Sequence, residues 1–540
     1  MPKPWIGRNF DHEGAGVIVP ARDESRDPDV TSRSATENYS ASDLPGRRRS
    51  VFASLREALS REDLDGVVHC AVKIRNALPN RDRLEDNVVL VAYGGGKDSS
   101  YTLAFARAVQ LLLVQAYGST FSMRVVTNRH AGMPTAVMDN IQRAYRVLDL
   151  FDDPQCQLLL IDGHEVHRFD ATLPQSEHVV RRNRTDILMT GHRTFADARP
   201  TFCNACNLSM VNSFGLAASI DGGADLIITG DSQREQRDYY LWVNRLATRF
   251  GVATNGTRKA GFRGFLTAAD TIAQAYFTDI HGADNAEATA ERRVVTNVPE
   301  ELRFFSIYDD TVYSSGGHWQ LLTEFLGFQF DDIAFSFTES DCGNPALMAH
   351  LRGLKAERLQ QRSYSDGLSE YVTFALSLMR RKEFPNTLID IMQERYGDNS
   401  AFDRMRKRMD EYAKDTYGLT EQHLICMVYS PFAGEGAGLE TYLAREQPAL
   451  ANRIEEIRTL LGTEDRPEAL AEVVSELERI SGLDLQQLRV LYDSPLRTPS
   501  AAADGNDLLG AILDGDPHKD VIRTRNAPNG PIVLEMLSGR

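Results

Sequence analysis

Three consecutive glycines followed by a lysine, an acid and two hydroxyl residues make residues 94–100 the stretch of this chain best suited to chemistry. Val88–Ala92, all apolar, and Tyr93 come before it, and an apolar stretch over 101–117 follows and stops at Gly118. This order predicts a buried strand, a tight turn and a helix start. Glycines let backbone N–H groups approach an anion, and a helix N-terminus adds a positive dipole end. We therefore expect a phosphate-binding loop here.

Two commoner phosphate motifs do not fit this loop. The Walker motif has a glycine five residues before its Gly-Lys pair and Ser or Thr directly after the lysine. Val91 and Asp98 occupy these two places in this chain. The dinucleotide-binding motif needs a third glycine where Ser99 stands. The loop therefore belongs to a different class of phosphate site.

The residues after the loop predict alternating strands and helices. Such alternation is typical of an α/β fold with a doubly wound parallel sheet. The expected strands lie at 123–127, 157–161 and 225–229, and the expected helices at 134–150 and about 207–221.

Polar residues stand where these expected strands end. Asn128 follows the second strand, and Thr229, Gly230 and Asp231 end the strand over 225–229. Ligands of parallel sheets lie beyond the C-terminal ends of the strands. We therefore expect these residues to converge with the glycine loop.

The loop resembles the PP-loop of the ATP pyrophosphatase superfamily, also described as adenine nucleotide alpha hydrolase-like. That family has the pattern Ser-Gly-Gly-x-Asp-Ser after its first strand, and here only the first place differs, with Gly94 in place of Ser. The matching places are held by Gly95, Gly96, Lys97, Asp98 and Ser99. The resemblance covers roughly residues 85–345 and implies a sheet of the HUP/PP-loop type.

The resemblance also implies an activity, cleavage of ATP to AMP and pyrophosphate with adenylation of a substrate oxygen. Asp98 would orient or bind Mg²⁺, and Lys97 would offset the charge of the leaving pyrophosphate, so these two are the candidate catalytic residues. The family usually has an acidic pair after the Thr229–Gly230 position, and the sequence from Asp231 onward does not reproduce it cleanly. The expected ATP-binding residues are Tyr93, Gly94, Gly95, Gly96, Lys97, Asp98, Ser99, Ser100, Asn128, Thr229, Gly230 and Asp231.

Sulfur forms a second group of candidates. Cys203 and Cys206 make a CxxC pattern, which alone is compatible with zinc, an iron–sulfur cluster, a redox pair or chance. Family members that put sulfur into tRNA bases carry CxxC at this place, and some have a further cysteine shortly before a proline, as Cys342 is here. The resemblance thus implies a shared site for a [4Fe-4S] cluster, or for Zn²⁺ with a fourth ligand such as His350. The alternative is that Cys342 is a small buried apolar residue. Core positions are expected for Cys70, Cys156 and Cys426.

Composition narrows the class of protein. The 540 residues are 42% hydrophobic and 25% charged, as in ordinary soluble proteins. Six cysteines in this length favour a reducing compartment. No apolar run approaches the length of a membrane helix, and residues 1–5 lack a signal core, so we expect a cytoplasmic protein without membrane contact. The net charge of −16 counts against broad contact with nucleic acid.

The chain divides into five expected segments. Residues 1–50 are rich in Asp, Ser, Arg, Pro and Gly and predict a disordered tail. A helical lead-in at 51–84 precedes the PP-loop domain at 85–345. Helical patterns then fill 346–496, and 497–540 reads as a flexible arm with many Pro, Gly, Ala and Asp residues.

The sequence therefore predicts an ATP-dependent adenylating enzyme of the amidotransferase or sulfurtransferase type. Its substrate would be a small molecule, or a peptide-borne or carrier-borne acyl group, whose carbonyl or carboxylate oxygen is replaced by nitrogen or sulfur from a donor. Thiolation of a tRNA base is the first alternative, with tRNA as partner. A non-catalytic nucleotide-binding module is the second. A homodimer is compatible with the sequence.

Overall fold

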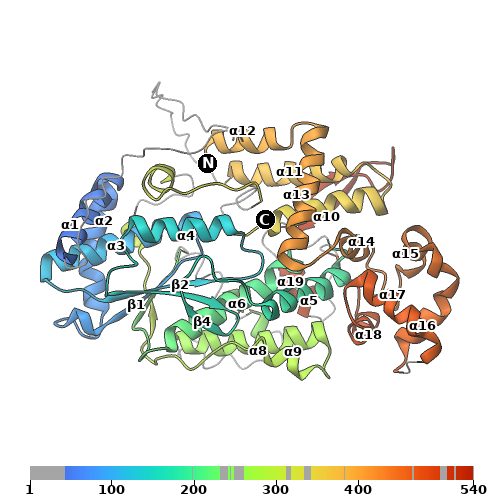
Figure 1. Ribbon diagram of the computed structural model, residues 1–540, viewed down its shortest axis with the longest axis horizontal. Helices are drawn as coiled ribbons and strands as arrows, with labels where there is room; N and C mark the ends of the chain where they lie inside the picture. Colours follow the sequence, from blue (N-terminus) through green and yellow to red (C-terminus); the bar gives the residue numbers. More distant parts are fainter. Residues whose placement is uncertain are drawn as a thin grey trace, which may run out of the picture. The chain divides into compact units, whose positions relative to one another are not determined.

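Parallel strands form the framework of the protein, and helices cover both faces of their sheet (Figure 1). This computed structural model describes residues 43–196, 199–230, 237, 241–243, 245–248, 261–311, 318–333, 342–381, 384–464, 467–498, 508–515 and 519–538. Within these residues the sheet is six-stranded, in the order β4-β3-β2-β1-β5-β6. Its strands are β1 (Val88–Ala92), β2 (Ser122–Asn128), β3 (Cys156–Asp162), β4 (Glu165–Arg168), β5 (Leu226–Ile228) and β6 (Arg303–Phe304).

The pairing of these strands brings their C-terminal ends to one edge. β1 lies between β2 and β5 and runs parallel to both, β2 is parallel to β3, and β5 is parallel to β6. Only β4 runs antiparallel, as the hairpin partner of β3. The predicted α/β class with a largely parallel sheet is therefore confirmed. The short strands β4 and β6 were not expected.

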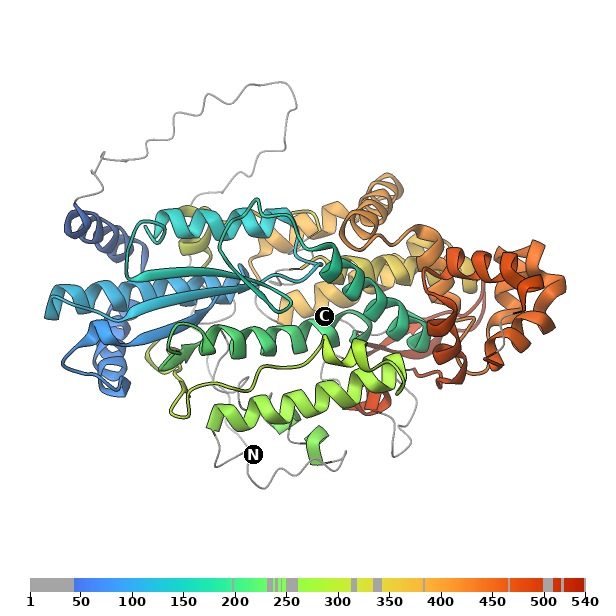
Figure 2. The ribbon, with the colours of Figure 1, turned by 60° about the horizontal axis from the view of Figure 1, so that its bottom comes forward.

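Alternating residues of β1 face two separate cores. Val89 and Val91 pack on one side with helices α1–α4, whereas Leu90 packs on the other with α5, α6 and α8. This follows from the two-residue period of a strand, and both faces are apolar because both are covered. In Figure 2, α4 lies on one side of the sheet and α6 and α8 on the other. The helices are α1 (Leu44–Ala58), α2 (Arg61–Ala77), α3 (Lys97–Tyr117), α4 (Thr135–Val147), α5 (Glu177–Thr194), α6 (Pro200–Ser219), α8 (Gly261–His281) and α9 (Ala286–Ala290).

Two helices next to the expected site start earlier than the sequence predicted. α3 begins at Lys97, so Lys97 to Ser100 form its first turn and do not precede it. α6 begins at Pro200, which suits the first position of a helix because proline has no N–H to leave unpaired. Both cysteines of the CxxC pattern therefore lie inside α6.

The chain after residue 343 is mainly helical. The N-terminal and C-terminal segments of the protein differ from what the sequence predicted. α1 begins at Leu44, inside the segment predicted as a tail, whereas residues 1–42 lie outside the described part. The segment predicted as a flexible arm contains a helix and a β-hairpin. Within the described ranges, no helix is both long and apolar enough to cross a membrane. The elements are α10 (Asn344–Leu354), α11 (Tyr364–Arg381), α12 (Asn386–Arg395), α13 (Asn399–Tyr417), α14 (Glu421–Tyr429), α15 (Leu439–Glu446), α16 (Ile454–Gly462), α17 (Ala471–Ser481), α18 (Leu485–Asp493), α19 (Leu508–Gly515), β7 (Lys519–Thr524) and β8 (Val533–Ser538).

A buried ion network joins α1 and α3 to the start of β3. Arg107 on α3 and Asp153 before β3 have fully buried side chains, with Nη2 and Oδ2 3.0 Å apart. Arg48 on α1 approaches the same carboxylate at 2.6 Å. Burial alone would raise the pKa of Asp153, but the hydrogen bonds from Arg48 and the charge of Arg107 outweigh it and lower the pKa to about 2. The carboxylate therefore stabilises the fold as an anion.

Replacing Asp153 with Asn should lower the free energy of unfolding at pH 7 by about 3 kcal/mol, because Arg107 then stays buried without its counter-charge. Since the folded pKa is depressed from 3.8 to about 2, the contribution is complete above pH 4 and lost as the pH falls toward 2. Urea unfolding of wild type and variant at several pH values should show the difference shrinking below pH 4. The control is Asp152→Asn, whose side chain is 76% exposed. Equal effects of the two substitutions would contradict the account.

Candidate functional site

The glycine loop is tied through Tyr93 to β2 and to the first turn of α3. The N–H of Tyr93 donates to the carbonyl of Val126 at 2.8 Å, and the hydroxyl of Thr127 donates to the carbonyl of Tyr93 at 2.8 Å. The Tyr93 hydroxyl is hydrogen-bonded to the Ser100 hydroxyl at 3.2 Å, and both side chains are buried. The bond from Tyr93 to Ser100 closes the base of the loop, and Tyr93 therefore shapes the loop from its interior.

Gly95 is required by the fold itself. Its φ of +81° lies in the left-handed region, which side chains with a Cβ rarely adopt. A Cβ built at Gly95 would lie 2.8 Å from Ile141 Cγ1 and 2.9 Å from Val137 Cγ1, both on α4. The approach of a phosphate is thus not the only reason for glycine at this position. The close packing of the loop on α4 is a second reason.

The first turn of α3 presents backbone N–H groups beyond the end of β1. Gly96 is the N-cap residue, with φ −79° and ψ 172°, and it has no side chain that could accept from these groups. The hydroxyls of Ser99 and Ser100 instead donate back to the Gly96 carbonyl at 3.1 and 2.8 Å. The positive end of the helix dipole is thus combined with a small N-cap, the arrangement that suits an anion.

The two candidate catalytic residues pair with each other. The side chain of Lys97 is 1% exposed, and its Nζ lies 2.8 Å from Asp98 Oδ1 and 5.6 Å from the ring centroid of Trp319. The Asp98 side chain is 35% exposed, so it reaches the surface whereas Lys97 does not. The carboxylate is therefore the group available to a cation from solvent, and the lysine holds it in place. Sequence reasoning missed Trp319, which lies more than two hundred residues along the chain.

The end of β5 packs directly on the first turn of α3. A Cβ at Gly230 would lie 3.0 Å from the Ser99 nitrogen and 3.1 Å from its Cα, so a side chain here would push the two backbones apart by a few tenths of an ångström. The Tyr308 hydroxyl donates to the Gly230 carbonyl at 2.8 Å and is also hydrogen-bonded to the Thr102 hydroxyl at 3.0 Å. The structure therefore brings the Thr229–Gly230 end together with the glycine loop. No sequence signal pointed to Tyr308.

Two more residues were predicted at strand ends, Asn128 and Asp231, and the structure describes only the first of them. Asn128 ends β2, and its Oδ1 accepts a hydrogen bond from the Ser209 hydroxyl of α6 at 3.3 Å. Asn128 thus contacts α6, the helix that carries the CxxC pattern. Asp231 lies outside the described residues.

The three candidate metal-binding cysteines come from two helix starts. Cys203 and Cys206 are one turn apart in α6, and Cys342 directly precedes Gly343, the N-cap of α10. Burial raises the pKa of Tyr417, and the thiolate charges of Cys342 and Cys206 act in the same direction. Cys206 and Cys342 therefore lie near one tyrosine.

These cysteines are not assembled as a ligand set in this structure. Among the residues that the structure describes, no three His, Cys, Asp or Glu side chains are grouped as a metal ion would require. The suggested fourth ligand is also engaged: His350 Nε2 is bonded to Asp410 at 2.9 Å and Nδ1 to the Tyr364 hydroxyl at 2.7 Å. Both ring nitrogens of His350 are thus engaged within the fold, and its role as a zinc ligand stays a prediction.

The remaining cysteines lie in the cores, as expected. Cys70 and Cys426 are fully buried, and burial raises the pKa of Cys156 and Cys426 to about 12. None of the six cysteines forms a disulfide. The thiols of Cys70, Cys156 and Cys426 therefore remain protonated at neutral pH and act as small apolar groups.

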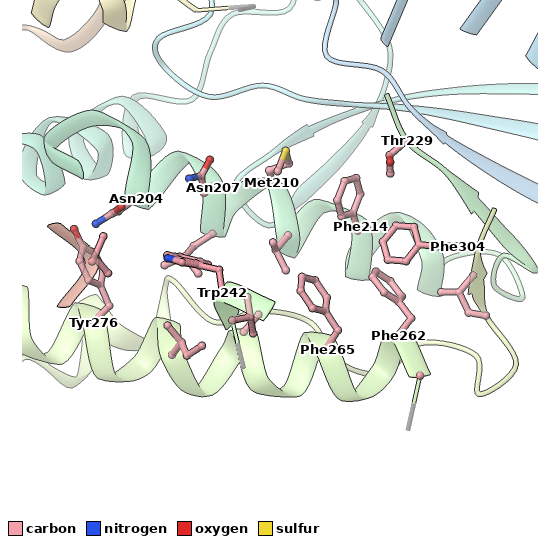
Figure 3. A pocket seen from close by; sticks show the side chains of 18 of the residues that line it. Asn204, Asn207, Met210, Phe214, Thr229, Trp242, Phe262, Phe265, Tyr276 and Phe304 are labelled. Carbon is pink, nitrogen blue, oxygen red and sulfur yellow. The ribbon is translucent and has the colours of Figure 1, made fainter. Parts of the chain in front are cut away.

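A cavity of about 550 Å³ opens beside Thr229, between α6 and α8 (Figure 3). Aromatic side chains dominate its wall: Phe214, Trp242, Phe262, Phe265, Tyr276 and Phe304. These residues are scattered over about ninety positions of the sequence, and no periodic pattern marked them as one surface.

Comparison of the chain with protein-family profiles, curated proteins and solved structures found no match. The functional assignment therefore rests on the site itself. Its central elements are the glycine loop, the pair of Lys97 and Asp98, and the end of β5.

Replacing Gly95 with Ala should lower the free energy of unfolding by about 2–4 kcal/mol, since it combines backbone strain with two close contacts to α4. The matched control is Gly118→Ala at the end of α3. Gly118 has a similar φ of +75°, but nothing lies within 4 Å of its added Cβ. Denaturant unfolding should show a clearly larger loss for the loop variant. Equal losses would mean that the packing on α4 contributes nothing.

Proposed function

We propose that this protein is an adenylating ATP pyrophosphatase of the PP-loop type. It would cleave ATP to AMP and pyrophosphate and activate a carbonyl or carboxylate oxygen for replacement by nitrogen or sulfur. The observation that carries the proposal is the glycine loop that opens α3 at the C-terminal edge of a parallel sheet. A loop of this composition at this place is suited to a phosphate chain.

The topology of the sheet supports this location. From β1 the chain builds outward through β2 and β3 on one side and then returns to β5 on the other. In open α/β sheets the ligand lies where the strand order reverses, beyond the strand ends. Here that point lies between β1 and β5, where Gly230 packs on Ser99. The HUP-type assignment of the sheet is part of the proposal.

The residues present fit the chemistry of adenylation. A substrate oxygen attacks the α-phosphorus of ATP and forms a new P–O bond, while the bond to the β-phosphate breaks and pyrophosphate leaves with the electron pair. A nitrogen or sulfur nucleophile then attacks the activated carbon, and AMP leaves with the oxygen. The N–H groups of the α3 start would hold phosphate oxygens, and Asp98 would hold Mg²⁺, which neutralises phosphate charge when bound.

The cysteines take no part in these steps as the structure stands. A cluster or zinc ion at Cys203, Cys206 and Cys342 remains a proposal drawn from the sequence resemblance. It would require the three thiols to gather from the positions they now hold on α6 and before α10. No step of the reaction is therefore assigned to them.

The charge of the chain favours a substrate other than tRNA. A protein that binds tRNA needs a basic surface for the phosphates, and the net charge here is −16. We therefore propose a small molecule, or an acyl group borne by a peptide or carrier, as acceptor. AMP formation only in the presence of tRNA would select base thiolation. Nucleotide binding without turnover would select a non-catalytic module.

With ATP, Mg²⁺, a mixture of carboxylic acids and ammonium or sulfide, turnover should release AMP and pyrophosphate. Ion-exchange chromatography measures AMP from α-labelled ATP and pyrophosphate from γ-labelled ATP. Asp98→Asn should lower the rate about 100-fold by weakening the hold on Mg²⁺. Release of ADP and orthophosphate would contradict the proposal.

Stability has to be controlled in this test, because Asp98 is the ion partner of the buried Lys97. Asp98→Ala should lower the melting temperature by removing a carboxylate 2.8 Å from the buried Lys97 ammonium, and the double variant Lys97→Met/Asp98→Ala should recover it. Both variants should remain deficient in AMP formation, because both lack the Asp98 carboxylate. Asp82→Asn, at a fully exposed side chain before β1, is the control for general effects of charge.

A further inference from the structure

The cavity between α6 and α8 has the size and lining of a ligand site. Its volume of about 550 Å³ falls in the range of small-molecule pockets. Six aromatic side chains line it, and Phe262 packs edge-on against Phe304 with ring centroids 4.8 Å apart. Apolar cavities of this size weaken a fold, because the wall loses contacts that a filled core would make. A bound ligand that fills this cavity would restore those contacts and would explain why the cavity is present.

The polar groups of the wall are few and uncharged, apart from one arginine. Among the described lining residues Arg303 alone carries a charge, and its side chain is exposed at the rim. Tyr276 is bonded to the Thr190 hydroxyl at 3.2 Å, and burial raises its pKa to about 12, so it stays neutral. Asn204 and Asn207 add amide groups from α6. The occupant must therefore have an apolar body.

One end of the cavity reaches the proposed ATP site. Figure 3 shows Thr229 and Phe304 at one end of the wall and Tyr276 and Asn204 at the other. Thr229 directly follows β5, and the next residue, Gly230, packs on the first turn of α3. A molecule lying along the cavity thus has one end beside the glycine loop and its remainder among aromatic rings.

We propose that this cavity is the acceptor site, and that the acceptor is a carboxylic acid with an aromatic or medium-length aliphatic body. The body lies between α6 and α8, and the carboxylate faces Thr229 and the glycine loop. This inference rests on the proposed function, since the carboxylate oxygen is the group that attacks the α-phosphorus. The apolar wall explains why the body is chosen by shape and hydrophobicity.

Filling the cavity tests the proposal. Ala269 on α8 lines it and is 2% exposed, so Ala269→Trp should occupy the space. Calorimetric titration should show that wild type binds 3-phenylpropanoate and octanoate, with a negative heat-capacity change, and does not bind glutarate. The variant should weaken binding by about tenfold or more. Thr267→Trp, at an exposed position on the same helix, should change it less than about twofold.

A second variant that fills the cavity keeps the test valid if Ala269→Trp does not fold. Val211→Trp enters the cavity from α6 and should have the same effect as Ala269→Trp. The inference would be overturned if wild type did not bind these acids, or if neither filling variant weakened the binding. This holds whether or not the protein cleaves ATP to AMP. Gly95→Ala should leave the binding of these acids intact while it impairs ATP turnover. Binding that depends on the cavity without any AMP formation would instead reject the proposed function, and with it the acceptor role.

Discussion

The close approach of two backbones, at the end of β5 and at the start of α3, is the constraint on which the site depends. A Cβ at Gly230 would stand 3.0 Å from the Ser99 nitrogen, and one at Gly95 would meet α4 at 2.8 Å. The loop is thus held between β5 and α4, with glycine at both contacts. Such packing fixes the N–H groups of the first helical turn before any ligand arrives, which lowers the ordering cost of binding.

The rest of the molecule serves this arrangement. The core that contains Val89 and Val91 places α3 and α4 on one face, and the core that contains Leu90 places α6 and α8 on the other. The first core packs against the glycine loop, and the second encloses the aromatic cavity. Because β5 belongs to the same sheet as β1, the residues that follow it, Thr229 and Gly230, lie beside both the cavity and the glycine loop. The site therefore lies at the switch between the two halves of the sheet.

Local patterns were enough to predict the strand, the loop and the helix, because each depends on residues near in sequence. Val88–Ala92 is β1 with the predicted bounds, and Gly118 ends α3 where expected. The start of α3 was misplaced because Lys97 and Asp98 are polar and were assigned to the loop. In the fold Lys97 is buried beside Trp319, a contact that no local pattern contains.

Features that join distant segments could not be predicted. The cavity is lined by side chains from α6, α8 and β6. No pattern in the sequence indicates that these three elements line the same cavity. His350 was suggested as a metal ligand from its residue type, but Asp410 and Tyr364 already occupy both ring nitrogens. Hydrogen-bond partners fourteen and sixty residues away decide such roles, and they become visible only in the folded chain.

The most direct test of the central claim is hydrogen–deuterium exchange with and without ATP and Mg²⁺. The account predicts slower exchange in peptides covering residues 93–102 and 226–230, because the phosphates bind the N–H groups of the loop and stabilise its contact with the end of β5. Peptides from α11, which lies outside the sheet, should exchange unchanged. Protection that spares residues 93–102, or that is confined to the helices after residue 343, would contradict the account.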